Sequence, residues 1–154
     1  MNIPLRMKTR IMWSSAAAGA VGVPGAFGAH LDLMAITAIW ATLLVMLADQ
    51  AGSSLDKAKA AKIVAAILAG ITFFGTGFKL ANTYFAYTGI GTIPAVIANV
   101  GANAGITYLF GNAAARSFLS EGTSGPAQSI GASILAIMVS MLTGTDTSGP
   151  SDIT

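Results

Sequence analysis

The uneven distribution of charge is the sequence feature that most constrains the fold. The fourteen residues from Asp49 to Lys62 hold five of the charged side chains, and the long runs on either side hold almost none. Only 9% of the residues are charged and 54% are apolar, whereas ordinary globular domains carry roughly a quarter of their residues as charged side chains. Charges gathered at a few points of an apolar chain are typical of a protein whose main solvent is lipid. The sequence therefore predicts an integral membrane protein.

The apolar runs predict an all-α fold of four to five hydrophobic helices. We expect two helical hairpins, over residues 11–48 and 63–111, followed by a last helix over residues 127–142. The first apolar run, residues 11–22, is shorter than the roughly 20 residues that a spanning helix needs. Some of the helices are therefore candidates for re-entrant segments.

The same pattern predicts one domain with two short extensions. Residues 1–10 form a basic segment at the membrane interface, residues 11–143 form a single membrane-embedded helical domain, and residues 144–154 form a polar tail. Basic residues next to apolar helices favour the cytoplasmic side. The expected location is the bacterial inner membrane, with the basic loops in the cytoplasm.

Two basic clusters are the candidate contacts with lipid head groups, because Lys and Arg next to membrane helices attract anionic lipids. The clusters consist of Arg6, Lys8 and Arg10, and of Lys57, Lys59 and Lys62.

Asp32 precedes the apolar run 33–48 and is predicted to cap that helix at its N-terminus. His30 and Asp32 together also suggest a proton relay or a metal ligand pair. A typical metal site needs more converging ligands than one histidine provides, so we favour the helix cap.

Polar and small residues follow separate faces of the predicted helix over residues 95–111. Asn99, Asn103 and Thr107 recur every fourth residue, and Gly101 and Gly105 form a GxxxG pair on a neighbouring face. The asparagines either line a permeation pathway or form hydrogen bonds between helices while the glycines admit a partner helix. We favour helix packing and assembly, because amides in lipid usually bind a protein partner.

The last helix carries a similar stripe of small residues for packing or assembly, which consists of Ser129, Ser133, Ala136 and Ser140.

Few residue types suited to catalysis are present. The chain has no cysteine, one histidine and six acidic residues, four of which lie in loops or the tail. Gly70 and Gly75 have the spacing of a phosphate-binding loop, but Thr76 and Gly77 stand where Lys and Ser or Thr are required. Basic stripes with interleaved aromatic residues, which indicate nucleic-acid binding, are absent from the sequence. We therefore expect no enzyme activity, no metal, no cofactor other than lipids, and no nucleic-acid partner.

Three stretches carry a resemblance to a known family. The first is Val23-Pro24-Gly25, with Asp32 ahead of an apolar helix and a polar segment near Gly52. The second is Gly89-Ile90-Gly91-Thr92. The third runs from Gly101 through Thr107-Tyr108 to Gly111, with Ala113, Arg116 and Phe118 after it. The region from Val23 to Phe118 resembles the bacterial GTPase-associated helical membrane domain of unknown function (YcjF-like or EcsC-like). Thr88 stands at the position of that family's proline, and the GTPase half has no counterpart in this sequence. The resemblance implies an all-helical membrane module with a separately encoded GTPase as a further partner.

These features lead to one functional hypothesis and two alternatives. The hypothesis is a self-associating integral membrane protein that acts as a structural scaffold or membrane-shaping component of a homo-oligomeric bilayer assembly. The small-residue stripes and the scarcity of catalytic residue types favour it. The alternatives are an oligomeric channel or transport-like protein, and a membrane anchor for a separate GTPase.

Overall fold

The described part of the chain is entirely α-helical. The computed structural model describes residues 2–25, 31–69 and 92–144, and these residues contain no strand. The predicted all-α class is thus confirmed. The helices are α1 (Leu5–Gly25), α2 (Leu31–Gln50), a helical segment over residues 57–69, α4 (Thr92–Glu121) and α5 (Ala127–Thr143).

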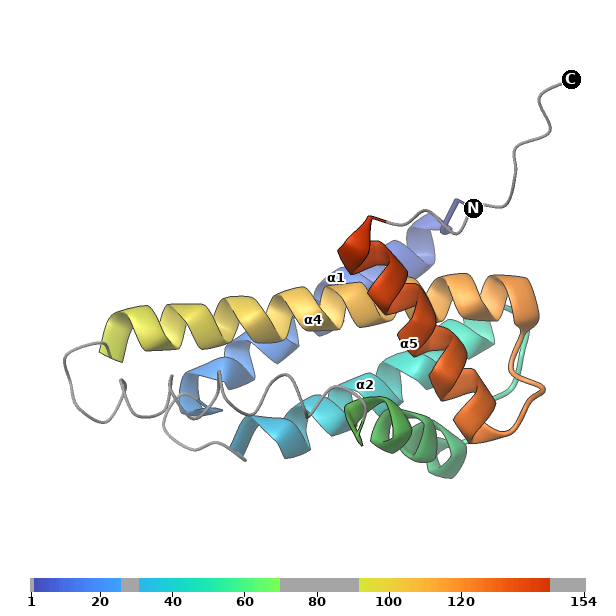
Figure 1. Cartoon of the computed structure of the whole chain (residues 1–154), viewed down its shortest axis with the longest axis horizontal. Coiled ribbons are helices and arrows are strands. Elements are labelled where there is room, and N and C mark those ends of the chain that lie inside the picture. Colours follow the sequence, from blue (N-terminus) through green and yellow to red (C-terminus); the bar gives the residue numbers. More distant parts are fainter. Residues whose placement is uncertain (1, 26–30, 70–91, 145–154) are drawn as a thin grey trace, which may run out of the picture.

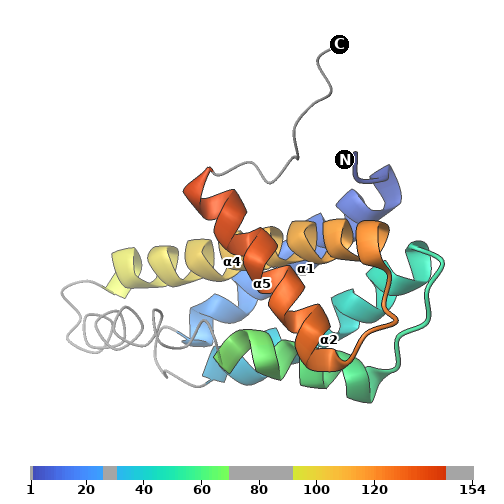
Figure 2. The same cartoon turned by 45° about the vertical axis from the view of Figure 1, so that its right-hand side comes forward.

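The long helix α4 is the element on which the others converge. It packs against α1, α2 and α5, and α1 also packs against α2. In both views α5 lies across α4, and the helical segment 57–69 lies next to α2 (Figures 1 and 2). Each described helix therefore buries one side against its neighbours and leaves another side uncovered by the described residues.

The core centres on an aromatic pair between α2 and α4. The rings of Trp40 and Phe110 are stacked, with centroids 4.1 Å apart and an angle of 6° between their planes. Both side chains are almost completely buried. The same hydrophobic cluster contains apolar side chains from α1, α2, the segment 57–69 and α5, and these include Met7, Ile11, Leu43, Leu44, Leu47, Ile63, Ile67, Ile134 and Met138. Burial of this apolar surface supplies the main favourable free energy of the fold.

A close contact between α1 and α4 depends on two glycines of α1. A Cβ atom at Gly22 would lie 2.9 Å from both the Cα and the N atom of Val100, and one at Gly19 would lie 3.3 Å from the Cβ of Ala104. A side chain at Gly22 would therefore clash with the backbone of α4, which cannot rotate away. Glycine at these positions lets the two helices approach each other closely.

Two loops at one end of the bundle are held together by Thr123. Its hydroxyl donates a hydrogen bond to the carbonyl oxygen of Ser54 over 3.2 Å, and its own carbonyl oxygen accepts one from Lys59 Nζ over 2.8 Å. Asp56 caps the helical segment 57–69, because its Oδ1 accepts a hydrogen bond of 2.7 Å from the backbone N–H of Lys59. The charge-rich stretch from Asp49 to Lys62 thus contains an ordered connection with defined polar contacts.

Some helix boundaries differ from those predicted. Helix α1 begins at Leu5 and includes the basic residues, since Met7 and Ile11 are buried on one of its sides while the basic side chains around that side are exposed. Helix α4 continues to Glu121, ten residues beyond the predicted end at Gly111. Helix α5 matches the predicted run to within one residue and ends at Thr143, and the φ of 67° at the following Gly144 is the left-handed conformation that glycine adopts readily.

The length and apolar character of the described helices bear on the predicted membrane-spanning helices. Within residues 2–25, 31–69 and 92–144, no helix combines the length and the apolar character required to cross a membrane. The predicted hairpin over residues 63–111 includes residues 70–91, which lie outside the described residues, as does Lys79. The predicted tail over residues 145–154 also lies outside them.

Candidate functional site

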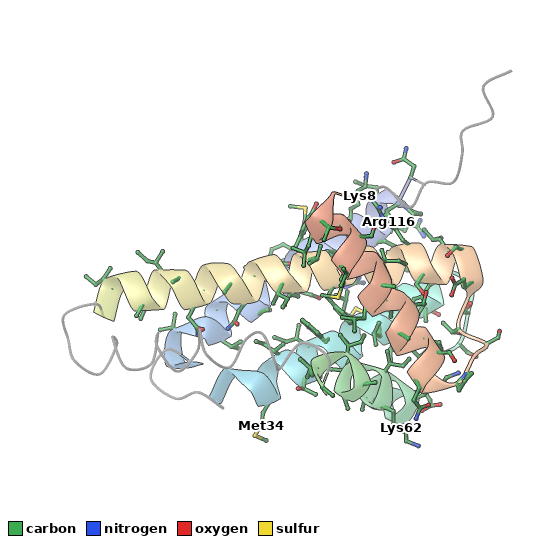
Figure 3. The ribbon with its side chains drawn as sticks, in the orientation of Figure 1. Lys8, Met34, Lys62 and Arg116 are labelled. Atoms are coloured by element: carbon green, nitrogen blue, oxygen red, sulfur yellow. The ribbon has the colours of Figure 1, made fainter. Side chains whose placement is uncertain are left out.

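The charged residues gather at one end of the bundle. Helix α1 and the segment 57–69 begin at this end, and α2 and α4 end there (Figure 1). In Figure 3, Lys8, Lys62 and Arg116 lie in this half of the molecule, and Met34 lies towards the other half. We call this region the basic end, and its charged residues are Arg6, Lys8, Arg10, Asp49, Asp56, Lys57, Lys59, Lys62, Arg116 and Glu121. Basic residues outnumber acidic ones there by seven to three.

The residues predicted to contact lipid head groups all lie at the basic end, but they are not equivalent. Arg6, Lys8, Arg10, Lys57 and Lys62 are exposed. Lys59, by contrast, is half-buried and uses its ammonium group to bind the carbonyl oxygen of Thr123. Five of the six side chains are therefore available to an anionic surface, and Lys59 has a structural contact within the chain.

The predicted GxxxG pair lies on a side of α4 that the other described helices leave uncovered. A Cβ atom at Gly101 or at Gly105 would meet no heavy atom within 4 Å. Ile93, Ile97 and Tyr108 continue the same side of the helix, and they are 72%, 66% and 52% exposed. The five residues are spaced by four, four, four and three positions, so they form one stripe. We call this stripe the outer face of α4.

Asn99, Asn103 and Thr107 lie on the opposite side of α4, inside the bundle. All three are at most 2% exposed. The Nδ2 of Asn99 donates a hydrogen bond of 2.8 Å to the carbonyl oxygen of Gly22, and the Oγ1 of Thr107 accepts one of 2.8 Å from Trp40 Nε1. These polar groups join α4 to α1 and α2. Their burial is compatible with helix packing and does not provide the lining of an open pathway.

The serine stripe of α5 divides between two environments. The Oγ of Ser133 donates to Oε2 of Glu121 over 3.1 Å and lies 3.4 Å from the Oγ of Ser117, which is buried on α4. Ser129 is exposed, and Ser140 is half-buried. Ser133 is thus a member of the stripe that connects α5 to α4.

Asp32 lies in the first turn of α2, which begins at Leu31. The side chain of Asp32 and the whole of His30 lie outside the described residues. The capping role of Asp32 therefore stays a prediction.

Sequence reasoning missed the glycines that do pack inside the chain. Gly19 and Gly22 lie in an Ala-rich stretch that was interpreted only as a short apolar run. Their spacing of three residues, together with Ser15 one turn earlier, places three small residues on one side of a helix. That spacing was the available signal.

Groups suited to chemistry are sparse in the described part of the chain. No cluster of three or more His, Cys, Asp or Glu residues that could hold a metal ion occurs among the described residues. The arrangement provides a charged surface, an apolar helix face and buried interhelical hydrogen bonds. These features are suited to binding another protein chain or lipid at the surface of the bundle.

No family model, no curated protein and no solved structure matches this chain. The resemblance to the GTPase-associated helical domain accordingly stays a prediction.

Proposed function

We propose that this chain is a self-associating membrane protein that acts as a structural component of a homo-oligomeric assembly in the bilayer. The observation that carries the proposal is the outer face of α4, where Gly101 and Gly105 are open and Ile93, Ile97 and Tyr108 are exposed. An apolar face that no described helix covers needs lipid or a protein partner. In such a face, the glycines allow the backbone of a second helix to approach closely.

The shape of the outer face favours a second copy of the chain as the partner. The two glycines have no side chains, and the exposed side chains of Ile97 and Tyr108 flank them along the stripe. Two copies of the same stripe can pack against each other around a twofold axis, as isologous interfaces do. Because the stripe contains no charged residue, such a contact would bury no unpaired charge.

The separation of charge from apolar surface supports the membrane part of the proposal. The basic end offers five exposed cations to anionic head groups. Away from that end, exposed apolar side chains such as Met34 and Val23 suit a hydrocarbon environment. We therefore propose that the helices are embedded in the bilayer as hairpins, with the basic end at the cytoplasmic head groups of a bacterial inner membrane.

Oligomer size and vesicle binding test this proposal together. The wild-type chain in a mild detergent should form an oligomer by light scattering, and it should float with liposomes that contain anionic lipid. Gly105→Ile places a branched side chain in the outer face and should dissociate the oligomer while the helical circular dichroism is retained. In the monomer this side chain meets open space.

The matched control is Ala20→Ile on α1, because Ala20 is also a small exposed residue in a helix but is not part of the outer face. This variant should keep the oligomer. A wild-type chain that stays monomeric at all concentrations, or that does not bind liposomes, would show that the proposal is wrong.

A further inference from the structure

An open groove lies between α1 and α2. Its volume is about 350 Å³, and its walls include Arg10, Trp13 and Ala17 from α1 and Ala38, Ile39 and Met46 from α2. The hydroxyl of Thr42, which also lines the groove, donates a hydrogen bond of 2.8 Å to the carbonyl oxygen of Ala38. Since that hydroxyl is already bound within its own helix, the wall formed by α2 is effectively apolar.

The groove is polar at one end and apolar at the other. Helices α1 and α2 run in opposite directions (Figure 1), so Arg10 lies at the basic end, near the part of α2 that contains Met46. Ala17 is seven residues further along α1, which corresponds to about 10 Å of helix rise. It faces the part of α2 that contains Ala38. Only Ser14 adds a second polar side chain to the wall formed by α1.

Arg10 is the group that selects a ligand for this groove. It is exposed, and among the residues that the structure describes no carboxylate forms an ion pair with it. Its neighbours Arg6 and Lys8 are also basic, so the local charge favours an anion. A guanidinium group presents a planar fork of donors that matches the oxygens of a phosphate.

Trp13 indicates the level at which a bilayer would meet the groove. Its side chain is 73% exposed although it is large and mainly apolar. Tryptophan prefers the interface between head groups and hydrocarbon, where its ring is in an apolar environment and its N–H remains near water. Trp13 lies one helical turn from Arg10, towards the apolar end of the groove, as expected if Arg10 is at the phosphate level.

We infer that this groove binds one anionic phospholipid of the bilayer. The Arg10 guanidinium binds the phosphate, and an acyl chain lies past Trp13 along the apolar walls towards Ala17 and Ala38. The inference rests on the proposed membrane location and adds a defined lipid site to it. It predicts a preference for phosphatidylglycerol over phosphatidylcholine, because the positive charge of the choline group would face the cations around Arg10.

Fluorescence quenching of Trp13 by brominated lipids tests the site in the full chain. The protein in a neutral detergent is titrated with phosphatidylglycerol that carries bromine on its acyl chains, and separately with brominated phosphatidylcholine. Phosphatidylglycerol should quench Trp13 at lower concentration. Trp40 is 1% exposed and contributes a background signal, which is measured in a Trp13→Phe variant.

Variants distinguish this groove from general attraction to the basic end. Arg10→Gln should weaken phosphatidylglycerol binding about tenfold, as expected for the loss of a charge-assisted hydrogen bond. Arg6→Gln removes the same charge from an exposed position of the same helix outside the groove, so it should weaken the binding clearly less than Arg10→Gln does. Ala38→Phe fills the apolar end of the groove and should reduce quenching by both lipids.

The outcomes separate this inference from the proposed function. Selective quenching that Arg10→Gln shifts to about tenfold higher lipid concentration supports the site, even if the chain proves monomeric or does not float with liposomes. Equal quenching by the two lipids, or equal effects of Arg6→Gln and Arg10→Gln, would overturn the inference while leaving self-association intact. Unquenched Trp13 together with an oligomer that Ala38→Phe dissociates would assign the groove to a second copy and also overturn it.

Discussion

The Nδ2 of Asn99 donates a hydrogen bond of 2.8 Å to the carbonyl oxygen of Gly22. Gly22 is in the last turn of α1, where carbonyl groups have no partner within their own helix. The side chain of α4 therefore satisfies an acceptor at the end of α1. The absence of a side chain at Gly22 lets the backbone of Val100 approach closely enough for this bond to form. The close approach and the hydrogen bond depend on each other.

Gly22→Ala should destabilise the fold, whereas Gly101→Ala should not. The new Cβ at position 22 would lie 2.9 Å from two backbone atoms of Val100, so α1 and α4 must separate. Overpacking of this kind costs about 1–3 kcal/mol. At Gly101 the new methyl group meets open space, and alanine favours the helix by about 0.5–1 kcal/mol.

Chemical denaturation followed by circular dichroism measures both variants in the same detergent. Equal stabilities for Gly22→Ala and Gly101→Ala would contradict the close contact at Gly22. Both variants are measured in a detergent and at a concentration in which the chain is monomeric, because in the proposed oligomer a second copy would cover Gly101.

Asn99→Leu should cost about 1–3 kcal/mol of unfolding free energy, because it leaves the buried carbonyl oxygen of Gly22 without its donor. The matched control is Asn112→Leu. Asn112 donates to the carbonyl oxygen of Tyr108 within its own helix, so its loss should cost little. Thermal unfolding of the two variants measures how much stability each substitution removes. Equal losses would argue against a special role for the contact between α1 and α4.

The class of the fold could be predicted from the sequence because helices are local structures. The run of apolar residues from Ala127 to Leu142, with breakers on both sides, predicted α5 almost to the residue. The end of α4 was placed ten residues too early, because its last turns contain Arg116 and Glu121. Those two charged residues ended the apolar pattern, but both are exposed in the structure while Phe118 between them is buried.

The spacing of small residues marks candidate packing faces, but it could not show which of these faces packs against another described helix. Gly101 and Gly105 have the familiar spacing, yet they face away from the described helices, whereas Gly22 is in tight contact with the backbone of α4. The pattern identifies a side of a helix, but the partner of that side depends on how distant segments pack. Asn99 lies less than one turn from Gly101 on the buried side. The two residue sets lie on opposite sides of α4, so the orientation of the helix about its axis decides which set is buried.

Asp56→Ala should lower the unfolding free energy by about 1 kcal/mol, because the carboxylate caps the helical segment 57–69 through the N–H of Lys59. Asp49→Ala serves as the control, because Asp49 is an exposed acidic residue at the same end of the molecule. This substitution removes the same charge as Asp56→Ala. Denaturant titrations should separate the two variants. A loss of the same size in both would attribute the effect to net charge and would argue against capping.

Thr107→Val should destabilise the core without changing its shape. Valine has nearly the volume of threonine, but it lacks the oxygen that accepts the hydrogen bond from Trp40 Nε1. The indole N–H is almost completely buried with its ring, so losing its partner should cost about 1–3 kcal/mol. Thr42→Val is the control, because the hydroxyl of Thr42 is exposed and bonded within its own helix. The stacked rings of Trp40 and Phe110 should persist in both variants. Near-ultraviolet circular dichroism would show this, and denaturant titrations would give the cost. A Thr107→Val protein as stable as Thr42→Val would contradict the role of this buried hydrogen bond in joining α2 to α4.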